Sequence, residues 1–211
     1  MKKIIIDLGN VLFKFHPEEF LSYFFDTKTM EDLMIIIFCS DEWLELDLGN
    51  LTMQEVIDIF SKRNPQYEKE ITFVLNNWSS MLIPIEKNVR ILKKLKEMGY
   101  PLYILSNFHK KTFEEMKKKH DFLDLFDGGI VSAYEHIIKP DERIYKLILE
   151  RYHLKAEECL FIDDSLTNIH VAQHLGIDGI HLKYGTDLNE ELTKKHILKN
   201  DLYKSFYLYF L

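Results

Sequence analysis

The sequence has few features, such as cysteines or long apolar segments, that would stabilise or anchor the protein in addition to its hydrophobic core. Its only cysteines, Cys39 and Cys159, match no metal-ligand spacing. They are interpreted as two free, buried thiols, which a reducing cytoplasm maintains. No apolar stretch approaches the ~18 to 20 residues that span a bilayer. The short apolar run after Lys2 and Lys3 is interrupted at Asp7, too early for a signal peptide. We therefore expect a cytoplasmic protein with no membrane partner.

Basic residues are too few for a protein that binds nucleic acid. The 211-residue chain has 27 Lys and Arg against 34 Asp and Glu, a net charge of −7 with His neutral. Because phosphate backbones select basic surfaces, we expect no nucleic-acid partner. A small anionic ligand still fits, since one lysine and one metal ion can bind a phosphate locally. With 46% hydrophobic residues, the chain is long enough for one core domain with an insertion.

Short apolar runs alternate with amphipathic helical patterns along most of the chain. Such alternation is typical of an α/β fold with a doubly wound, Rossmann-like parallel sheet. The predicted strands span 4–6, 102–105, 129–131, 159–162 and 179–182. The predicted helices between them span 87–98, 110–120, 142–152 and 166–175.

One long segment, residues 17–83, breaks this alternation and is predicted to form an inserted α-helical cap. Residues 1–16 and 84–199 would then form the core, and 200–211 an aromatic tail. The tail favours a terminal element docked on the sheet, with a dimer contact as the alternative, so the chain is expected to be a monomer or a homodimer. Helices are expected in the cap at 18–26, 30–38, 42–46, 53–63 and 67–78.

Polar residues follow three of the predicted strands directly. Asp7 follows the first strand, Ser106 the second, and Asp163 with Asp164 the fourth. Lys139 lies in a loop after the third strand. Singly, these residues have ordinary explanations as helix caps or a solvated turn. Ligands of open parallel sheets bind at the carboxyl ends of the strands, so together the residues indicate a site there.

Four blocks of the sequence carry a family resemblance. They are IIIDLGNV (4–11), LSN (105–107), KP (139–140) and FIDD (161–164). Their order, and an insertion after the first block, resemble the haloacid dehalogenase superfamily over the chain up to about residue 185. Within it, the blocks are most similar to bacterial sugar-1-phosphate phosphatases, and they also resemble the phosphatase domain attached to epoxide hydrolases.

The resemblance implies a phosphatase in which the Asp7 carboxylate attacks phosphorus and forms an aspartyl-phosphate. It also implies a Mg²⁺ ion that offsets the repulsion between the two anions. The expected ligands are Asp7, the backbone carbonyl of Gly9 and Asp164. Asp163 is the second choice, because it could instead bind a metal-bound water or orient Lys139.

Further site residues are expected on the same grounds. Ser106 and the backbone amide of Asn107, at a helix start, would bind phosphoryl oxygens. Lys139 would neutralise the charge that develops on them. The expected substrate is a small phosphorylated metabolite, namely a sugar phosphate, and a hexose 1-phosphate is the first candidate. By position alone, four residues could contribute to substrate choice: Trp43, Asp47, Phe20 and His16.

Gly9 departs from the pattern of the family. Most of its phosphatases have a second Asp at this position, which protonates the leaving group, and such help contributes about 10²–10⁴-fold. An anomeric sugar oxygen would leave with less help, or His16 could substitute. A metal-independent 2-haloacid dehalogenase is an alternative. Those enzymes lack the paired acids of the fourth block, whereas this sequence has Asp163 and Asp164. Without a cation, these two carboxylates would repel Asp7. The other alternative is a protein that binds a phosphate ligand or a partner with little turnover.

Overall fold

The computed structural model describes residues 1–199 and shows a five-stranded parallel sheet with the order β5-β4-β1-β6-β7. β1 lies at the centre, where Ile4 pairs with Leu102 on one side and with Leu160 on the other. Strand β1 is an uninterrupted apolar run because helices cover both of its faces. The strands are Lys3–Ile6 (β1), Leu102–Ser106 (β4), Gly128–Val131 (β5), Cys159–Asp163 (β6) and Asp178–His181 (β7).

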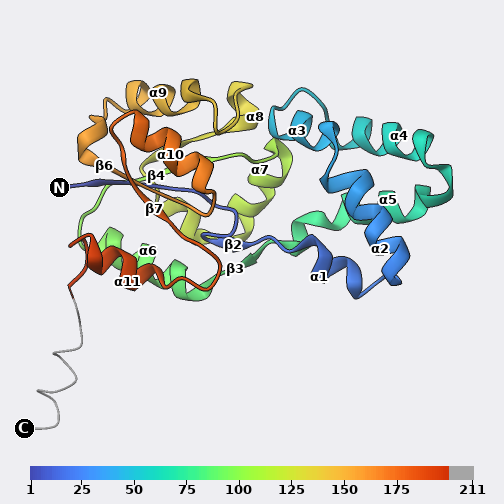
Figure 1. The fold of residues 1–211 in the computed structure, drawn as a ribbon, viewed down its shortest axis with the longest axis horizontal. Coiled ribbons are helices and arrows are strands. Elements are labelled where there is room, and N and C mark those ends of the chain that lie inside the picture. The colour runs from blue at the N-terminus through green and yellow to red at the C-terminus, as the bar shows by residue number, and fades with distance from the viewer. Residues whose placement is uncertain (200–211) are drawn as a thin grey trace, which may run out of the picture.

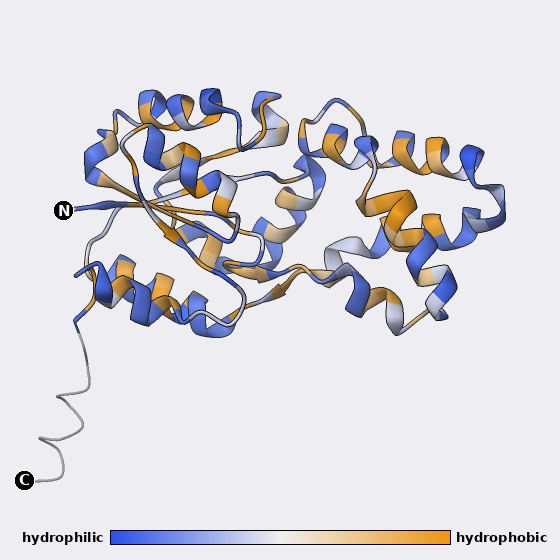
Figure 2. Ribbon diagram, in the orientation of Figure 1, coloured by the Kyte–Doolittle hydropathy of each residue, from blue (hydrophilic) through white to orange (hydrophobic). Residues whose placement is uncertain are grey.

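Helices cover both faces of the sheet, as Figure 1 shows. Successive side chains of β1 point to opposite faces. Ile4 and Ile6 therefore pack with α6 and α11, and Ile5 packs with α9 and α10. Figure 2 shows the apolar stripes of these helices turned toward the strands. The helices of the core are Glu86–Glu97 (α6), Lys110–Lys119 (α7), Ser132–Glu135 (α8), Glu142–Arg151 (α9), Leu166–His174 (α10) and Leu188–Lys194 (α11).

A group of helices beside the core forms the cap, on the right in Figure 1. A short antiparallel ribbon connects it to the core, with Phe13 of β2 paired to Pro84 of β3. Buried residues of the cap are continuous with the core on one side of the sheet. The cap elements are Pro17–Ser22 (α1), Thr27–Leu33 (α2), the π-helical turn Met34–Phe38, Asp41–Asp47 (α3), Met53–Arg63 (α4) and Glu68–Asn77 (α5), and the ribbon strands are Phe13–Lys14 (β2) and Ile83–Pro84 (β3).

The predicted α/β class is confirmed, with each predicted strand within one residue of its observed position. The ribbon, α8 and α11 were not expected, because each is too short or too irregular to give a periodic pattern. The interpretation of both cysteines as buried is wrong, because Cys39 is exposed while Cys159 is buried. The division at residues 17 and 83 stays a prediction, and the aromatic tail at 200–211 lies outside the described residues. Among residues 1–199, no helix combines the length and the apolar character that crossing a bilayer requires.

The end of α3 packs closely against α8 of the core. Gly49 has a φ of 71°, and a Cβ atom there would lie 2.2 Å from the carbonyl oxygen of Ala133. The Ser132 hydroxyl donates a hydrogen bond to the carbonyl oxygen of Asp47 at 2.5 Å. The Asn50 side chain contacts the His136 ring at 3.2 Å. Only glycine allows so close an approach of two backbones in this conformation.

Replacing Gly49 with alanine is therefore expected to lower the free energy of unfolding. The left-handed conformation costs an L side chain about 1–2 kcal/mol, and the contact with Ala133 adds to that cost. Gly99→Ala is the matched control, since Gly99 has a φ of 84° but no atom within 4 Å of its would-be Cβ. Urea unfolding should show a larger loss for Gly49→Ala than for Gly99→Ala, and equal losses would contradict the close approach.

Candidate active site

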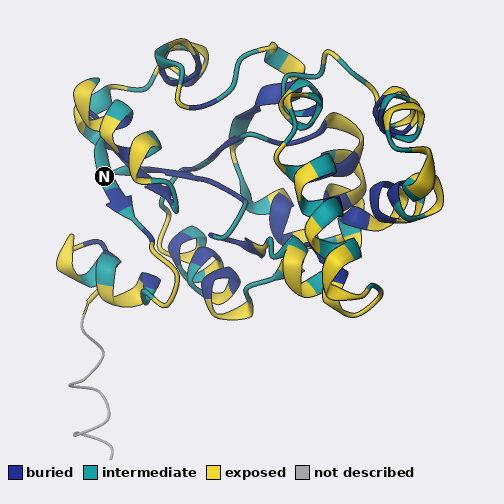
Figure 3. Ribbon diagram, turned by 45° about the vertical axis from the view of Figure 1, so that its right-hand side comes forward, coloured by how far each residue is buried: buried dark blue, intermediate teal, exposed yellow. Residues whose placement is uncertain are grey.

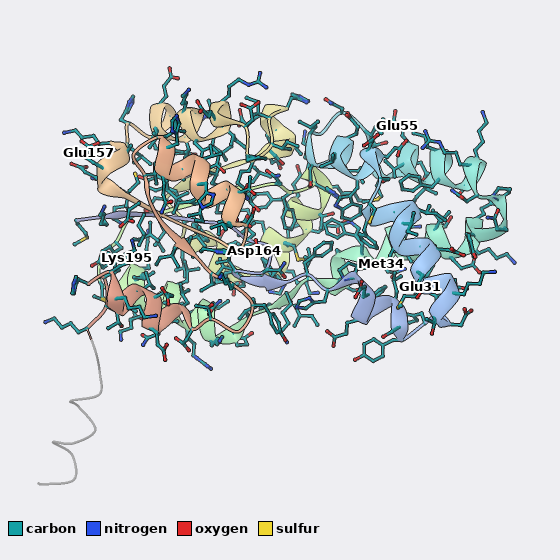
Figure 4. The ribbon with its side chains drawn as sticks, viewed as in Figure 1. Glu31, Met34, Glu55, Glu157, Asp164 and Lys195 are labelled. Carbon is teal, nitrogen blue, oxygen red and sulfur yellow. The ribbon has the colours of Figure 1, made fainter. Side chains whose placement is uncertain are left out.

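The carboxyl ends of three adjacent strands bring the predicted residues together. Asp7 follows β1, Ser106 ends β4, and Asp163 ends β6, with Asp164 next to it. The Asp7 amide extends the sheet by donating to the Ile162 carbonyl at 3.0 Å. Figure 4 places Asp164 at this edge, on the side of the core that faces the cap. Figure 3 colours much of the sheet dark blue, as buried. Asp7, Ser106 and Asp163 at the strand ends are buried as well.

Lys139 lies between two of the carboxylates. Its Nζ is 2.9 Å from Asp7 Oδ1 and 2.6 Å from Asp163 Oδ2. Asp7, Lys139 and Asp163 are only 7%, 4% and 0% exposed. Burial on its own would lower the pKa of Lys139, but the two carboxylates outweigh it and raise that pKa, so the amine is charged. Burial raises the pKa of Asp7 to about 6, while the charge of Lys139 works against this rise.

Hydrogen bonds saturate the Asp163 carboxylate. Besides Lys139, it accepts from the Ser165 amide at 2.7 Å and from Asn168 Nδ2 at 3.1 Å. This geometry suits the predicted role of orienting Lys139. The Asn168 side chain, from the first turn of α10, thus supports the position of the Asp163 carboxylate.

Asp164 is half-buried and less constrained than Asp163. Its Oδ2 accepts a hydrogen bond from Asn10 Nδ2 at 3.0 Å, and its backbone carbonyl contacts the His181 ring at 2.9 Å. Asn10 has a φ of 51°, a conformation that Asn adopts more readily than most residues, and its Oδ1 accepts from the Phe15 amide at 3.0 Å. Asn10 lies within the block IIIDLGNV, but its contact with Asp164 could not be predicted from the sequence.

These carboxylates form a set that suits a hard cation. One oxygen from each of Asp7, Asp163 and Asp164 lies within 4.8 Å of the others. Mg²⁺ prefers oxygen ligands of this kind and keeps several waters. Burial is the main cause that raises the pKa of Asp164 as well as that of Asp7, and a bound cation would offset it.

Ser106 and Asn107 occupy different roles in the structure. Ser106 is 1% exposed, and its hydroxyl makes no hydrogen bond to any of residues 1–199, although it lies close enough to Asp7 to lower that pKa. A buried hydroxyl without a partner is available to a ligand. The Asn107 side chain instead exchanges two hydrogen bonds with the backbone of Lys139, at 2.8 and 3.0 Å. The predicted helix start at Asn107 is wrong, because α7 begins at Lys110 and His109 is its N-cap.

A second titratable pair spans the interface of cap and core. His109 Nε2 lies 3.3 Å from Asp47 Oδ1, and the side chains are 4% and 15% exposed. Burial raises the pKa of Asp47 to about 7, with the charge of Asp7 adding to the rise and that of Lys139 opposing it. Burial lowers the pKa of His109 to about 3, so its ring is neutral. No pattern in the sequence indicates a role for His109, because that role depends on the docking of the cap.

An open cavity of about 350 Å³ adjoins Asp164. His16, the expected substitute proton donor, lines this cavity in the hinge region, with its ring 5.8 Å from that of Tyr184. Three lysines from separate segments of the core also line it, namely Lys14, Lys87 and Lys183.

Comparison with known proteins identifies the family. Residues 1–176 match the model of the haloacid dehalogenase-like hydrolases. The chain is 30% identical over 182 residues to a sesquiterpene phosphatase of Aspergillus oryzae, covering 86% of this chain and 89% of that protein. The chain therefore belongs to the haloacid dehalogenase-like hydrolases.

Two further relatives show the range of chemistry in this family. A HAD family enzyme of Bacteroides thetaiotaomicron, solved with magnesium and inorganic phosphate, superimposes with a TM-score of 0.72 at 27% identity, covering 90% of this chain and 98% of that one. An (S)-2-haloacid dehalogenase of Pseudomonas putida is 26% identical over 121 residues, 56% of this chain and 53% of that protein.

Asp47→Asn is expected to change how stability depends on pH. Because folding raises the pKa of Asp47 from 3.8 to about 7, the folded protein keeps a proton that the unfolded chain has released. The free energy of unfolding therefore falls as the pH rises from about 4 to about 7, by at most about 4 kcal/mol at roughly 1.4 kcal/mol per pKa unit.

Asn is neutral at every pH, so this decrease in the free energy of unfolding is absent from the variant. Urea unfolding at pH 5 and pH 8 should therefore show that the variant becomes more stable relative to the wild type as the pH rises. His109 titrates in both proteins, with the opposite sign, and its contribution cancels in the comparison. A stability difference that does not vary with pH would contradict a buried Asp47 with a raised pKa.

Proposed function

We propose that the protein is a magnesium-dependent phosphatase that hydrolyses a small phosphorylated metabolite through an aspartyl-phosphate on Asp7. The observation that supports this most directly is the cluster of carboxylates of Asp7, Asp163 and Asp164, which have one oxygen each within 4.8 Å of the others. Such a cluster beside a nucleophilic carboxylate suits a cation that screens two anions from each other. A dehalogenase expels halide and needs no such cluster.

Asp7, Asp164 and the backbone carbonyl of Gly9 would hold the metal ion. When bound, Mg²⁺ would lower the negative charge that an incoming phosphate meets. Asp163 would act mainly by fixing Lys139, because its oxygens already accept hydrogen bonds from Lys139, Ser165 and Asn168.

The remaining groups would hold the phosphoryl group in line with Asp7. The Ser106 hydroxyl would donate to a phosphoryl oxygen, consistent with its lack of a partner within residues 1–199. The Lys139 amine would face the same oxygens while contacting Asp7. Asn107 would contribute by clamping the Lys139 backbone. This arrangement positions reactants and stabilises charge, which accounts for most of the catalysis of phosphoryl transfer.

The substrate we propose is a sugar phosphate, with a hexose 1-phosphate first. An anomeric oxygen leaves with less protonation than an ordinary alcohol, which suits a chain with Gly9 in place of the second Asp. A substrate panel should also include an isoprenoid phosphate, because the relative from Aspergillus oryzae is a sesquiterpene phosphatase. A clear preference for nucleotides or phosphoproteins would contradict the sugar phosphate.

Asp7→Asn is expected to abolish turnover. Hydrolysis of p-nitrophenyl phosphate should require Mg²⁺, stop with EDTA, and fall at least roughly 10³-fold in Asp7→Asn, because an amide is a poor nucleophile. Asp124→Asn, at an exposed position of the core, is the control and should keep wild-type activity. Chloride release from 2-chloropropionate without metal would instead identify a dehalogenase, and inactivity in both assays across a phosphate panel would favour a binding protein.

Asp164→Asn is expected to remove the stabilisation by magnesium. An ion that binds only the folded state stabilises it by about 2.7 kcal/mol at 100 times its Kd. The melting temperature of the wild type and of Asp124→Asn should therefore rise with Mg²⁺, while that of Asp164→Asn should rise much less. An equal rise in all three proteins would place the ion elsewhere.

A further inference from the structure

Asp47 is a largely buried carboxyl group that the proposed chemistry leaves unused. Within the described part of the chain, His109 Nε2 at 3.3 Å is its one polar side-chain partner, and its oxygens accept no hydrogen bond there. A carboxyl group so poorly solvated costs stability when it is ionised. Such groups cluster at functional sites. Its place at the interface of cap and core brings it under the charges of Asp7 and Lys139.

The backbone of Asp47 is tied to the loop that follows Ser106. The Ser132 hydroxyl donates to the Asp47 carbonyl at 2.5 Å and accepts from the Phe108 amide at 2.9 Å. One side chain thus connects the end of α3 to a residue only two positions after Ser106. Together with the close approach of Gly49 to Ala133, this fixes Asp47 relative to the strand ends.

His109 contacts the Asp47 side chain without neutralising it. The His109 ring packs against both Trp43 and Trp78, with centroid distances of 4.5 and 4.6 Å. This apolar surrounding keeps the ring uncharged, so it does not form a salt bridge that would hold Asp47 as a carboxylate. His109 is therefore a positioning residue, and Asp47 can carry a proton near neutral pH.

We propose that Asp47 is the general acid and base of the reaction, supplied by the cap in place of the carboxylate that Gly9 lacks. This inference rests on the proposed phosphatase function. In phosphoryl transfer the attacking and leaving oxygens are roughly in line with phosphorus. Because Asp7 attacks from the sheet edge, the leaving oxygen departs toward the cap, where Asp47 lies. His16 is less suited, because it lines the open cavity in the hinge region.

The two half-reactions balance through this one carboxyl group. In the first, Asp7 forms a bond to phosphorus, the bond to the leaving oxygen breaks, and the Asp47 proton moves to that oxygen. In the second, the Asp47 carboxylate takes a proton from water as the water oxygen bonds to phosphorus. The bond between Asp7 and phosphorus then breaks, phosphate leaves, and Asp47 is protonated again.

The test compares Asp47→Asn with the wild type on a series of ring-substituted phenyl phosphates with Mg²⁺. These substrates differ little in shape but differ in how basic the leaving phenol is. Loss of a general acid should lower kcat/KM by roughly 10²-fold or more for phenyl phosphate, and by less than about 10-fold for p-nitrophenyl phosphate. Asp41→Asn, an exposed residue in the first turn of the same helix, is the matched control and should behave as the wild type across the series.

The pH profile of the wild type gives a second measurement that needs no variant. The kcat/KM for phenyl phosphate should fall above pH about 7, where Asp47 loses its proton. Absence of this limb would overturn the inference even if Asp47→Asn failed to fold. An equal loss of activity on every substrate would assign Asp47 a purely structural role. Failure of the wild type to hydrolyse any member of the series would overturn the proposed phosphatase function itself.

Discussion

The site depends on the buried amine of Lys139 between Asp7 and Asp163. Two buried carboxylates so close to each other would repel, and each would cost several kcal/mol to desolvate without a partner. Lys139 contacts both within 2.9 Å, and Asn107 fixes its backbone from the end of β4. Every strand end of the site is thereby connected to the loop between α8 and α9. The arrangement leaves Asp164, with its one described side-chain partner Asn10, as the carboxylate most accessible to a cation.

The positions of the acidic residues could be predicted from the sequence because they follow from strand geometry. An apolar run such as 4–6 fixes a buried parallel strand, and the residue after it must lie at the ligand-binding edge. The pairing of Lys139 with Asp163 was one of two predicted alternatives. The hydrogen bonds of the Asn107 side chain to Lys139 could not be predicted, because Ser-Asn before a helical pattern indicates a helix start, whereas two more residues precede α7.

Contacts between cap and core could not be predicted in the same way. His109 and Asp47 are separated by a large part of the chain, and neither belongs to a periodic pattern. They meet because Gly49 allows the end of α3 to approach α8, which depends on one backbone conformation and one missing Cβ atom. The sequence predicts a contribution of Asp47 to substrate choice only from its position in the cap. Its isolation from other polar groups became visible only with the cap in position.

The close docking of α3 has a consequence for how the proposed reaction would be controlled. Asp7 and Lys139 belong to the core, and their contacts given above are to neighbouring strands and loops of the core. Asp47 belongs to the cap, and burial is the main cause of its raised pKa. Undocking would return it to water, where its pKa would fall and it would lose its proton at neutral pH. A movement of the cap that admits a substrate would thus deprotonate Asp47. Docking would restore the proton only when the leaving oxygen is enclosed.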